Sequence, residues 1–131
     1  MKYLAVLFIM IISLMLLLAA VNQFLKKPPK QINLHDVARV QISLIEAAID
    51  TYLLNTGTYP DDLEDLMVCP TSMKGKWSGP YLKSNQLYDP WDRIFIYYPG
   101  GSGNQSGYEI ISYGEDGLPG GDGENADISN D

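Results

Sequence analysis

The stretch "LHDVARVQISLIEAAIDTYLLNTGTYP", residues 34–60, indicates the fold because it predicts one long amphipathic helix. Its apolar side chains recur at three- and four-residue steps, the spacing of one helix face. The main stripe holds Val37, Val40, Leu44, Ala48 and Tyr52, and Ile42, Ile45, Ile49 and Leu53 widen it. Asn33 is a suitable N-cap, Asp36 suits the positive end of the helix, and Gly57 can end it with a positive φ. We therefore expect a helix over 34–55 that covers a core.

The residues after this helix predict a short second helix and then a long loop. "TYPDDLEDLM", residues 58–67, opens with a turn, after which Asp61 can cap a helix and Glu64 can complete a capping box. From Val68 to Pro90 the chain holds several Gly and Pro residues, which are typical of loops.

Two segments rich in β-branched and aromatic residues then predict a hairpin. "RIFIYY" at 93–98 and "YEIISY" at 108–113 have the composition of strands, and the Gly-rich residues 99–107 join them. Two strands alone are marginally stable, so they must pack against the long helix. The predicted fold class is α+β.

The segment upstream of the long helix departs from the composition of a globular protein. Tyr3 to Val21 carries no charge, and at about 1.5 Å per residue it spans roughly the 30 Å hydrocarbon core of a membrane. A transmembrane helix is the first interpretation, and a cleaved signal segment or a buried soluble helix are the alternatives. "KKPPK" at 26–30 ends this helix. We therefore divide the chain into 1–30, an apolar helix with a Pro/Lys linker, and 31–131, a folded domain.

Charge is distributed unevenly between these two parts. Four of the nine Lys/Arg residues flank the apolar segment, whereas residues 31–131 hold five basic and all sixteen acidic residues, a net charge of −11. Nucleic-acid binding needs basic surface, so we expect no nucleic-acid partner. An acidic domain fits one that binds cations or one that simply stays soluble. By the positive-inside rule alone, the lysines after the apolar segment would place the domain in the cytoplasm.

The sequence offers little for catalysis. Cys69 is the only cysteine and His35 the only histidine, so neither a disulfide within the chain nor a CxxC metal pair exists. We expect His35 to be solvated at the start of the long helix, and Cys69 to pack under a loop. Asp89 and Asp92 flank a Pro-Trp pair and are expected to cap a turn. No nucleophile or general base is placed to act, so the chain is not expected to be an enzyme.

The stretch "SYGEDGLPGGDGENADI", residues 112–128, gathers five Gly and five carboxylates. Calcium binds six to eight oxygens, which carboxylates and turned-in backbone carbonyls supply, and Gly allows such turns. Composition alone leaves a disordered acidic tail as the alternative. The spacing is not that of an EF-hand, and zinc lacks His or Cys ligands nearby.

Several segments in order resemble the major (G-type) pseudopilin of type II secretion systems. They are "ISLIEAAIDTYLLNTGTYPDDLEDL", "WSGPYLK", "YDPWDRIFIYYPG" and "YEIISYGEDGLPGGDGENADI", and they cover about 90 residues, Ile42 to Ile128. The resemblance implies a type IV pilin or pseudopilin-like fold, in which a long N-terminal helix packs on a small antiparallel sheet and the final loop holds calcium. It implies a structural subunit that polymerises with other pseudopilin subunits and works with the secretion machinery.

The resemblance also implies a ligand set for calcium. Asp116 matches the first aspartate ligand of the family and Asp127 the last, while the carbonyls of Tyr113 and Leu118 match backbone ligands. Three residues compete for the remaining places, and one further carbonyl is available. These are Asp122, Glu124 and Asn125, with the carbonyl of Gly121.

The front of the chain departs from the pattern of this family. Members carry a Gly-Phe cleavage site and a glutamate in the apolar segment, and Tyr3 to Val21 contains neither. Two functions therefore stay open: a self-associating pseudopilus subunit, or a stand-alone calcium-binding domain, anchored or secreted, that does not polymerise. The resemblance places the chain in the bacterial inner membrane as a single-pass protein with its C-terminal domain in the periplasm, against the lysine count.

Overall fold

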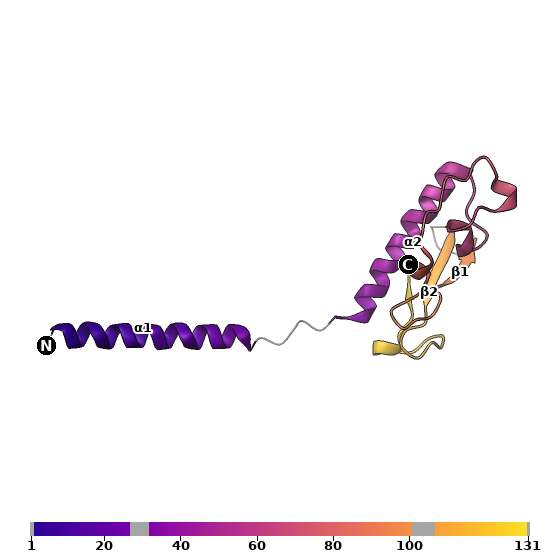
Figure 1. Ribbon diagram of the computed structural model, residues 1–131. Helices are drawn as coiled ribbons and strands as arrows, with labels where there is room; N and C mark the ends of the chain where they lie inside the picture. The colour runs from indigo at the N-terminus through magenta and orange to yellow at the C-terminus, as the bar shows by residue number, and fades with distance from the viewer. Residues whose placement is uncertain (1, 27–31, 101–106, 131) are drawn as a thin grey trace. The chain divides into compact units, whose positions relative to one another are not determined.

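The computed structural model describes residues 2–26, 32–100 and 107–130, and it divides the chain into two compact units, Met1–Gln31 and Ile32–Asp131 (Figure 1). Most of the predicted Pro/Lys linker and the tip of the predicted hairpin loop lie outside the described residues. The site is in the second unit.

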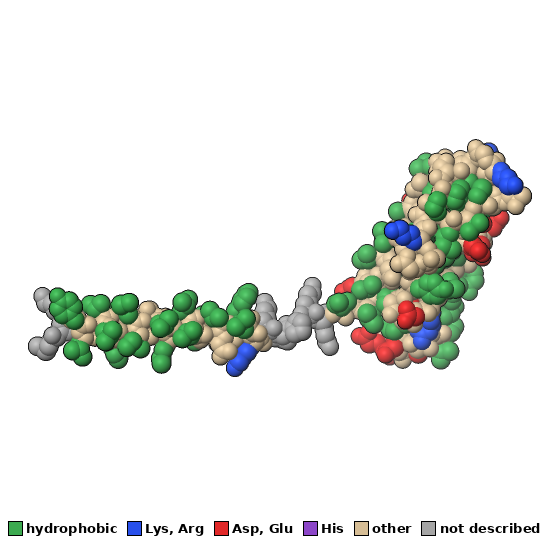
Figure 2. Space-filling model, in the orientation of Figure 1, with side chains coloured by type: hydrophobic (Ala, Val, Ile, Leu, Met, Phe, Trp, Pro, Cys, Tyr) green, Lys and Arg blue, Asp and Glu red, His purple; other side chains and the backbone are tan. Residues whose placement is uncertain are grey.

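The described residues of the first unit, 2–26, form one α-helix, α1 (Lys2–Leu25). The most apolar stretch within residues 3–25 has a mean hydropathy of 3.1, and none of that stretch is buried. Figure 2 shows apolar side chains along the length of this helix. The helix is long and apolar enough to cross a membrane, and it extends four residues beyond the predicted end of the apolar segment.

The second unit is built on α2 (Leu34–Thr56), whose two ends confirm the caps predicted from the sequence. The Asn33 side chain accepts a hydrogen bond of 2.9 Å from the backbone N–H of His35. At the other end Gly57 has φ 85°, and its N–H donates to the Leu53 carbonyl at 2.8 Å. Both caps are local interactions, which explains why the sequence predicts them well.

The buried face of α2 is narrower than the predicted stripe. Ile42, Ile45 and Ile49 are buried as expected, but Val40 is 61% and Leu44 is 50% exposed. A single small sheet and the loops beside it cover only one side of a helix, so the second row of the stripe faces solvent. The buried residues of α2 are His35, Ala38, Ile42, Ile45, Ala48, Ile49, Tyr52 and Thr56.

The sheet has three antiparallel strands in the order β1-β2-β3, and it packs on α2 through β2 and β3 (Figure 1). The strands are β1 (Ile96–Pro99), β2 (Tyr108–Ser112) and β3 (Ile128–Ser129). Ile96 pairs with Ile111 in the predicted hairpin, and Ser112 pairs with Ile128 on the other edge of β2. The sequence does not predict β3, because two residues are too few for an alternating pattern.

The first strand begins three residues later than predicted. Ile94 instead makes an isolated bridge with Tyr88, because a turn precedes it in which Asp92 adopts a left-handed φ of 62°. The short helix predicted within residues 58–67 is a 3-10 helix, Leu63–Leu66. It is capped by Asp62 with Asp65 as the capping-box partner, so the predicted caps, Asp61 and Glu64, were each wrong by one position.

The core of the second unit lies between α2, the sheet and the 3-10 helices. Outside α2, the buried apolar residues are Leu63, Leu66, Leu82, Leu87, Phe95, Tyr108, Ile110 and Ile128. Cys69 is half-buried, and its thiol donates to the Pro70 carbonyl at 3.5 Å; its packing under a loop stays a prediction. The arrangement confirms the predicted α+β class. The acidic loop follows directly after β2.

Candidate metal centre

The acidic loop between β2 and β3 is closed by hydrogen bonds within its own backbone. The Glu115 N–H donates to the Glu124 carbonyl at 2.9 Å and forms a neck at the base of the loop. Two glycines allow the chain to pass closely over itself. A Cβ on Gly114 would lie 2.8 Å from the Ala126 carbonyl oxygen, and one on Gly121 would lie 2.6 Å from the Asn125 carbonyl oxygen. Both glycines have positive φ, so other residues would strain the backbone there.

Two of the predicted ligands are oriented by the loop itself. One carboxylate oxygen of Asp116 accepts from the Leu118 N–H at 3.0 Å, and one of Asp127 accepts from the Gly120 N–H at 2.9 Å. Within residues 107–130, no hydrogen bond uses the second carboxylate oxygen of either side chain. Each aspartate is therefore oriented by one hydrogen bond, and its second oxygen is unused among the described residues of the loop; carboxylate oxygens are ligands that a hard cation prefers.

The other predicted ligands are distributed around the same loop. The Tyr113 carbonyl accepts from the Gly117 N–H at 3.2 Å, and it keeps a second lone pair. The Tyr113 side chain is hydrogen-bonded to Tyr98, and this bond raises the pKa of the Tyr113 hydroxyl. Asp122 precedes the 3-10 helix Gly123–Asn125. The Leu118 side chain is aliphatic and carries no ligand atom, so only its carbonyl is a possible ligand.

The composition of the loop fits calcium better than a transition metal. Among the described residues, no three Asp, Glu, His or Cys side chains converge into a metal cluster. A site here would combine two carboxylates with backbone carbonyls and water. Such all-oxygen sets suit calcium, whereas zinc prefers imidazole and thiolate ligands.

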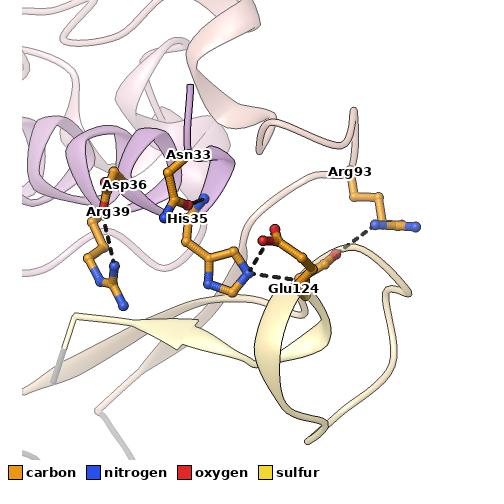
Figure 3. Close-up of polar contacts among 7 residues, drawn as sticks. Asn33, His35, Asp36, Arg39, Arg93 and Glu124 are labelled. Carbon is orange, nitrogen blue, oxygen red and sulfur yellow. Dashed lines mark hydrogen bonds and ion pairs between the residues drawn. The ribbon is translucent and has the colours of Figure 1, made fainter. Parts of the chain in front are cut away.

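His35 lies against this loop, and the prediction that it is solvated was wrong. It is only 9% exposed, and its ring meets the Trp91 ring edge-on with 5.5 Å between centroids. Nε2 is 3.0 Å from the Glu124 carbonyl, and because a carbonyl only accepts, Nε2 is the donor. Figure 3 shows the ring pointing from the start of α2 into the loop. The signal was present in the sequence, since His35 lies three residues before the buried Ala38 on the same helix face.

Arg93 contacts the loop from the side opposite His35 (Figure 3). Its Nη1 donates to the Gly114 carbonyl at 2.8 Å, and its Nη2 donates to the Glu115 carbonyl at 2.7 Å. The sequence does not predict this role, because its composition places Arg93 in a strand and the loop is more than 20 positions away.

A buried aspartate holds the backbone of Arg93 in place. Asp89 is 4% exposed, and one of its oxygens accepts from the N–H groups of Trp91 at 3.0 Å and Arg93 at 2.9 Å. Its other oxygen accepts from the Ser112 hydroxyl at 2.6 Å. The expected turn-capping role is confirmed for Asp89, which also connects the turn to β2.

Comparison with known proteins identifies the family of this chain. The family model described as "Type II secretion system (T2SS), protein G" matches residues 30–131. The chain belongs to this family. The match begins after α1, so it covers the whole of the second unit and confirms the resemblance seen in the sequence.

Individual relatives of the protein G family agree with this assignment. The chain is 38% identical over 93 residues to type II secretion system core protein G of Xanthomonas campestris pv. campestris, which covers 71% of this chain and 63% of the relative. It is 35% identical over 100 residues to the core protein G of Pseudomonas aeruginosa, covering 72% of this chain and 68% of the relative. The chain therefore spans less than two thirds of the Xanthomonas protein.

A solved structure confirms the fold as that of a pseudopilin. The crystal structure of the major pseudopilin from the type 2 secretion system of enterohaemorrhagic Escherichia coli superimposes with a TM-score of 0.57 at 25% identity. The match covers 74% of this chain and 85% of that chain. The protein G family consists of structural pseudopilin subunits and is not an enzyme family. Family membership together with the apolar α1 indicates a membrane-anchored protein.

Proposed function

We propose that this chain is a self-associating structural subunit of a type II secretion pseudopilus, working with other pseudopilins and with the secretion machinery. The observation that carries the proposal is the family match over residues 30–131, in a unit with the pseudopilin fold that follows an apolar helix. In this proposal α1 crosses the bacterial inner membrane once and the second unit lies in the periplasm. The lysines that follow α1 favour the opposite orientation by the positive-inside rule.

An unburied stripe on α2 supports self-association. Val40, Leu44 and Leu54 are 61%, 50% and 85% exposed. Together with Ala47 and Thr51 they follow three- and four-residue steps, so they lie along one side of the helix. Contiguous apolar surface of this kind is typical of an interaction site. The stripe is the surface through which we expect copies of this chain to pack.

Calcium is the second element of the proposal. Asp116 and Asp127 would supply carboxylate oxygens, and Tyr113 and Leu118 would supply carbonyl oxygens. Gly121, Asp122 and Asn125 are the candidates for the remaining places. When bound, the ion would neutralise part of the negative charge of the loop and tie β3 to β2. This support rests on the fixed orientation of the two aspartates and on the glycine turns.

The alternative function is a stand-alone anchored or secreted calcium-binding domain. It is favoured by one observation, the absence of a glutamate between Tyr3 and Val21. In the family that this chain resembles, this glutamate is thought to meet the N-terminal amine of a neighbouring subunit.

Cross-linking of the full chain in membranes separates the two functions. We expect a ladder of oligomers from the unmodified chain, weakened by Leu44→Asp. Ser72→Asp is the matched control, because Ser72 is also exposed but belongs to the 3-10 helix Thr71–Met73 and not to α2. A chain that stays monomeric at all concentrations would favour the stand-alone domain. Equal ladders from the two variants would exclude the stripe as the interface.

A further inference from the structure

The closed loop brings negative charges close together, and it contains no basic residue that would offset their repulsion. Residues 113–127 contain five carboxylates and no Lys or Arg. Like charges so close together favour an open loop, in which they move apart and stay hydrated. The described loop is nevertheless closed at its neck by the bond from Glu115 to Glu124. A cation from elsewhere in the chain that contacts the neck would offset part of this repulsion.

Arg93 is the cation that contacts the neck. Its two hydrogen bonds, 2.8 and 2.7 Å long, end on the consecutive carbonyls of Gly114 and Glu115. A guanidinium is always charged, and its planar fork suits two adjacent acceptors. The loop backbone also lies directly against the side chain, since a Cβ on Gly117 would be 2.6 Å from Arg93 Nε. The two carbonyls it uses are not among the proposed calcium ligands, so Arg93 leaves the ligands free.

Two hydrogen bonds with Asp89 fix the backbone of Arg93. Its N–H donates to Asp89 at 2.9 Å, and its carbonyl accepts from the Asp89 N–H at 2.7 Å. Asp89 is buried and bonded to Ser112 at the end of β2. A flexible side chain on a fixed backbone loses less entropy when it binds than one on a mobile loop.

His35 contacts the second chain segment of the neck, at Glu124. Its Nε2 donates to the same Glu124 carbonyl that accepts from Glu115, while Trp91 supports the ring. Arg93 and His35 therefore contact the two chain segments of the neck from opposite sides (Figure 3).

We propose that Arg93 is a positioning residue that acts as the built-in counter-ion of the acidic loop and holds it closed before a metal ion arrives. The part of this inference that concerns metal affinity rests on the proposed calcium function. Arg93 does not touch the ion; it acts by holding the backbone from which Asp116 and Tyr113 project. Without Arg93 the neck opens, and calcium must then also close the loop, which lowers its apparent affinity.

Two measurements on the full chain in detergent micelles test the proposal. The first is the rate of cleavage after Glu115 and Glu124 by a glutamate-specific protease in the presence of a chelator, followed by mass spectrometry. The second is the dissociation constant of calcium by titration calorimetry. Arg93→Gln should raise the cleavage rate and weaken calcium binding by about tenfold, the scale of two lost charge-assisted hydrogen bonds that in part are replaced by water.

Two further variants make the result specific. Arg93→Lys keeps the charge but not the fork, so it should lie between the unmodified chain and Arg93→Gln. Arg39→Gln is the matched control, because Arg39 is an exposed arginine whose side chain pairs with Asp36 of the same helix, at 3.3 Å, and not with the loop. It should leave both readouts unchanged. If tryptophan fluorescence shows that Arg93→Gln unfolds the second unit, the test becomes the comparison of Arg93→Lys with the unmodified chain.

The outcomes separate this inference from the proposed calcium function. If the unmodified chain binds no calcium, the calcium proposal fails, and the cleavage rates in chelator still decide whether Arg93 closes the loop. If Arg93→Gln and Arg93→Lys match the unmodified chain in both measurements, Arg93 does not position the loop and the inference is wrong. If cleavage changes but calcium affinity does not, closure by Arg93 stands and its effect on metal binding is overturned.

Discussion

Replacing Asp89 tests whether one buried carboxylate organises the turn that carries Arg93. The side chain is 4% exposed and accepts three hydrogen bonds, of which the shortest, 2.6 Å, comes from the Ser112 hydroxyl. Hydrogen bonds to charged groups contribute about 1.5–3 kcal/mol each. The bonds from the N–H groups of Trp91 and Arg93 are only part-buried, so water can partly replace their lost acceptor, whereas Ser112 is 2% exposed and its hydroxyl would lose a buried partner. Asp89→Ala should therefore lower the free energy of unfolding by about 3–4 kcal/mol.

Asp89→Asn should cost much less. Its amide oxygen can still accept from the two N–H groups, and the Ser112 hydroxyl can rotate to accept from the amide NH₂. We expect a loss of about 1 kcal/mol, which is the value of an ordinary hydrogen bond.

Guanidinium unfolding of the full chain in detergent measures both variants. Both tryptophans, Trp77 and Trp91, belong to the second unit, so their fluorescence reports on that unit and not on α1. With a slope of about 3 kcal/mol per molar denaturant, Asp89→Ala should move the midpoint down by about 1 M. Asp61→Ala, an exposed aspartate, is the control and should change stability by less than about 0.5 kcal/mol. Equal midpoints for Asp89→Ala and Asp61→Ala would refute the reasoning.

Four further predictions follow from features of both units. Calcium at a hundredfold excess over its dissociation constant should stabilise the second unit by about 2.7 kcal/mol and raise its melting temperature by several degrees. Asp116→Ala should remove most of this gain, and equal melting curves with calcium and with chelator would contradict the site. Ile45→Ala, at a fully buried position of α2, should cost about 2–5 kcal/mol in the same denaturant assay. Burial raises the pKa of Tyr97 to about 12, so its hydroxyl should titrate late in an absorbance titration. Because the unfolded chain releases this proton first, near pH 10, stability should fall as pH rises from there towards 12. Mass spectrometry of the mature chain should show an intact N-terminus if α1 is an anchor, and a start near Val21 if it is a cleaved signal.

The parts of the fold that sequence predicts well are those with local causes. The ends of α2 depend on Asn33 and Gly57, which act on neighbours within four positions. The hairpin depends on two segments of strand-forming residues close together in the chain. Family resemblance then adds the arrangement of helix and sheet, which the solved pseudopilin structure confirms.

The parts that sequence missed depend on partners far along the chain. His35 is buried by a contact with Glu124, 89 positions later. Arg93 was read as part of a strand, but a turn around Asp89 and the left-handed Asp92 delays the strand and directs the guanidinium to a loop 22 positions away. β3 exists because β2 offers it an edge. None of these contacts leaves a periodic signal in its own segment. The ligand set of the loop stays a prediction.

The contact between His35 and the loop also has a mechanical consequence. In the proposed anchored state, tension on α1 would enter the domain at Ile32, the first residue of the second unit. His35 is the first residue of α2 with a side chain buried against another part of the fold, and its bond to Glu124 and its contact with Trp91 would bear this load first. Anything that tightens the acidic loop would therefore stiffen the domain at the point where it is pulled.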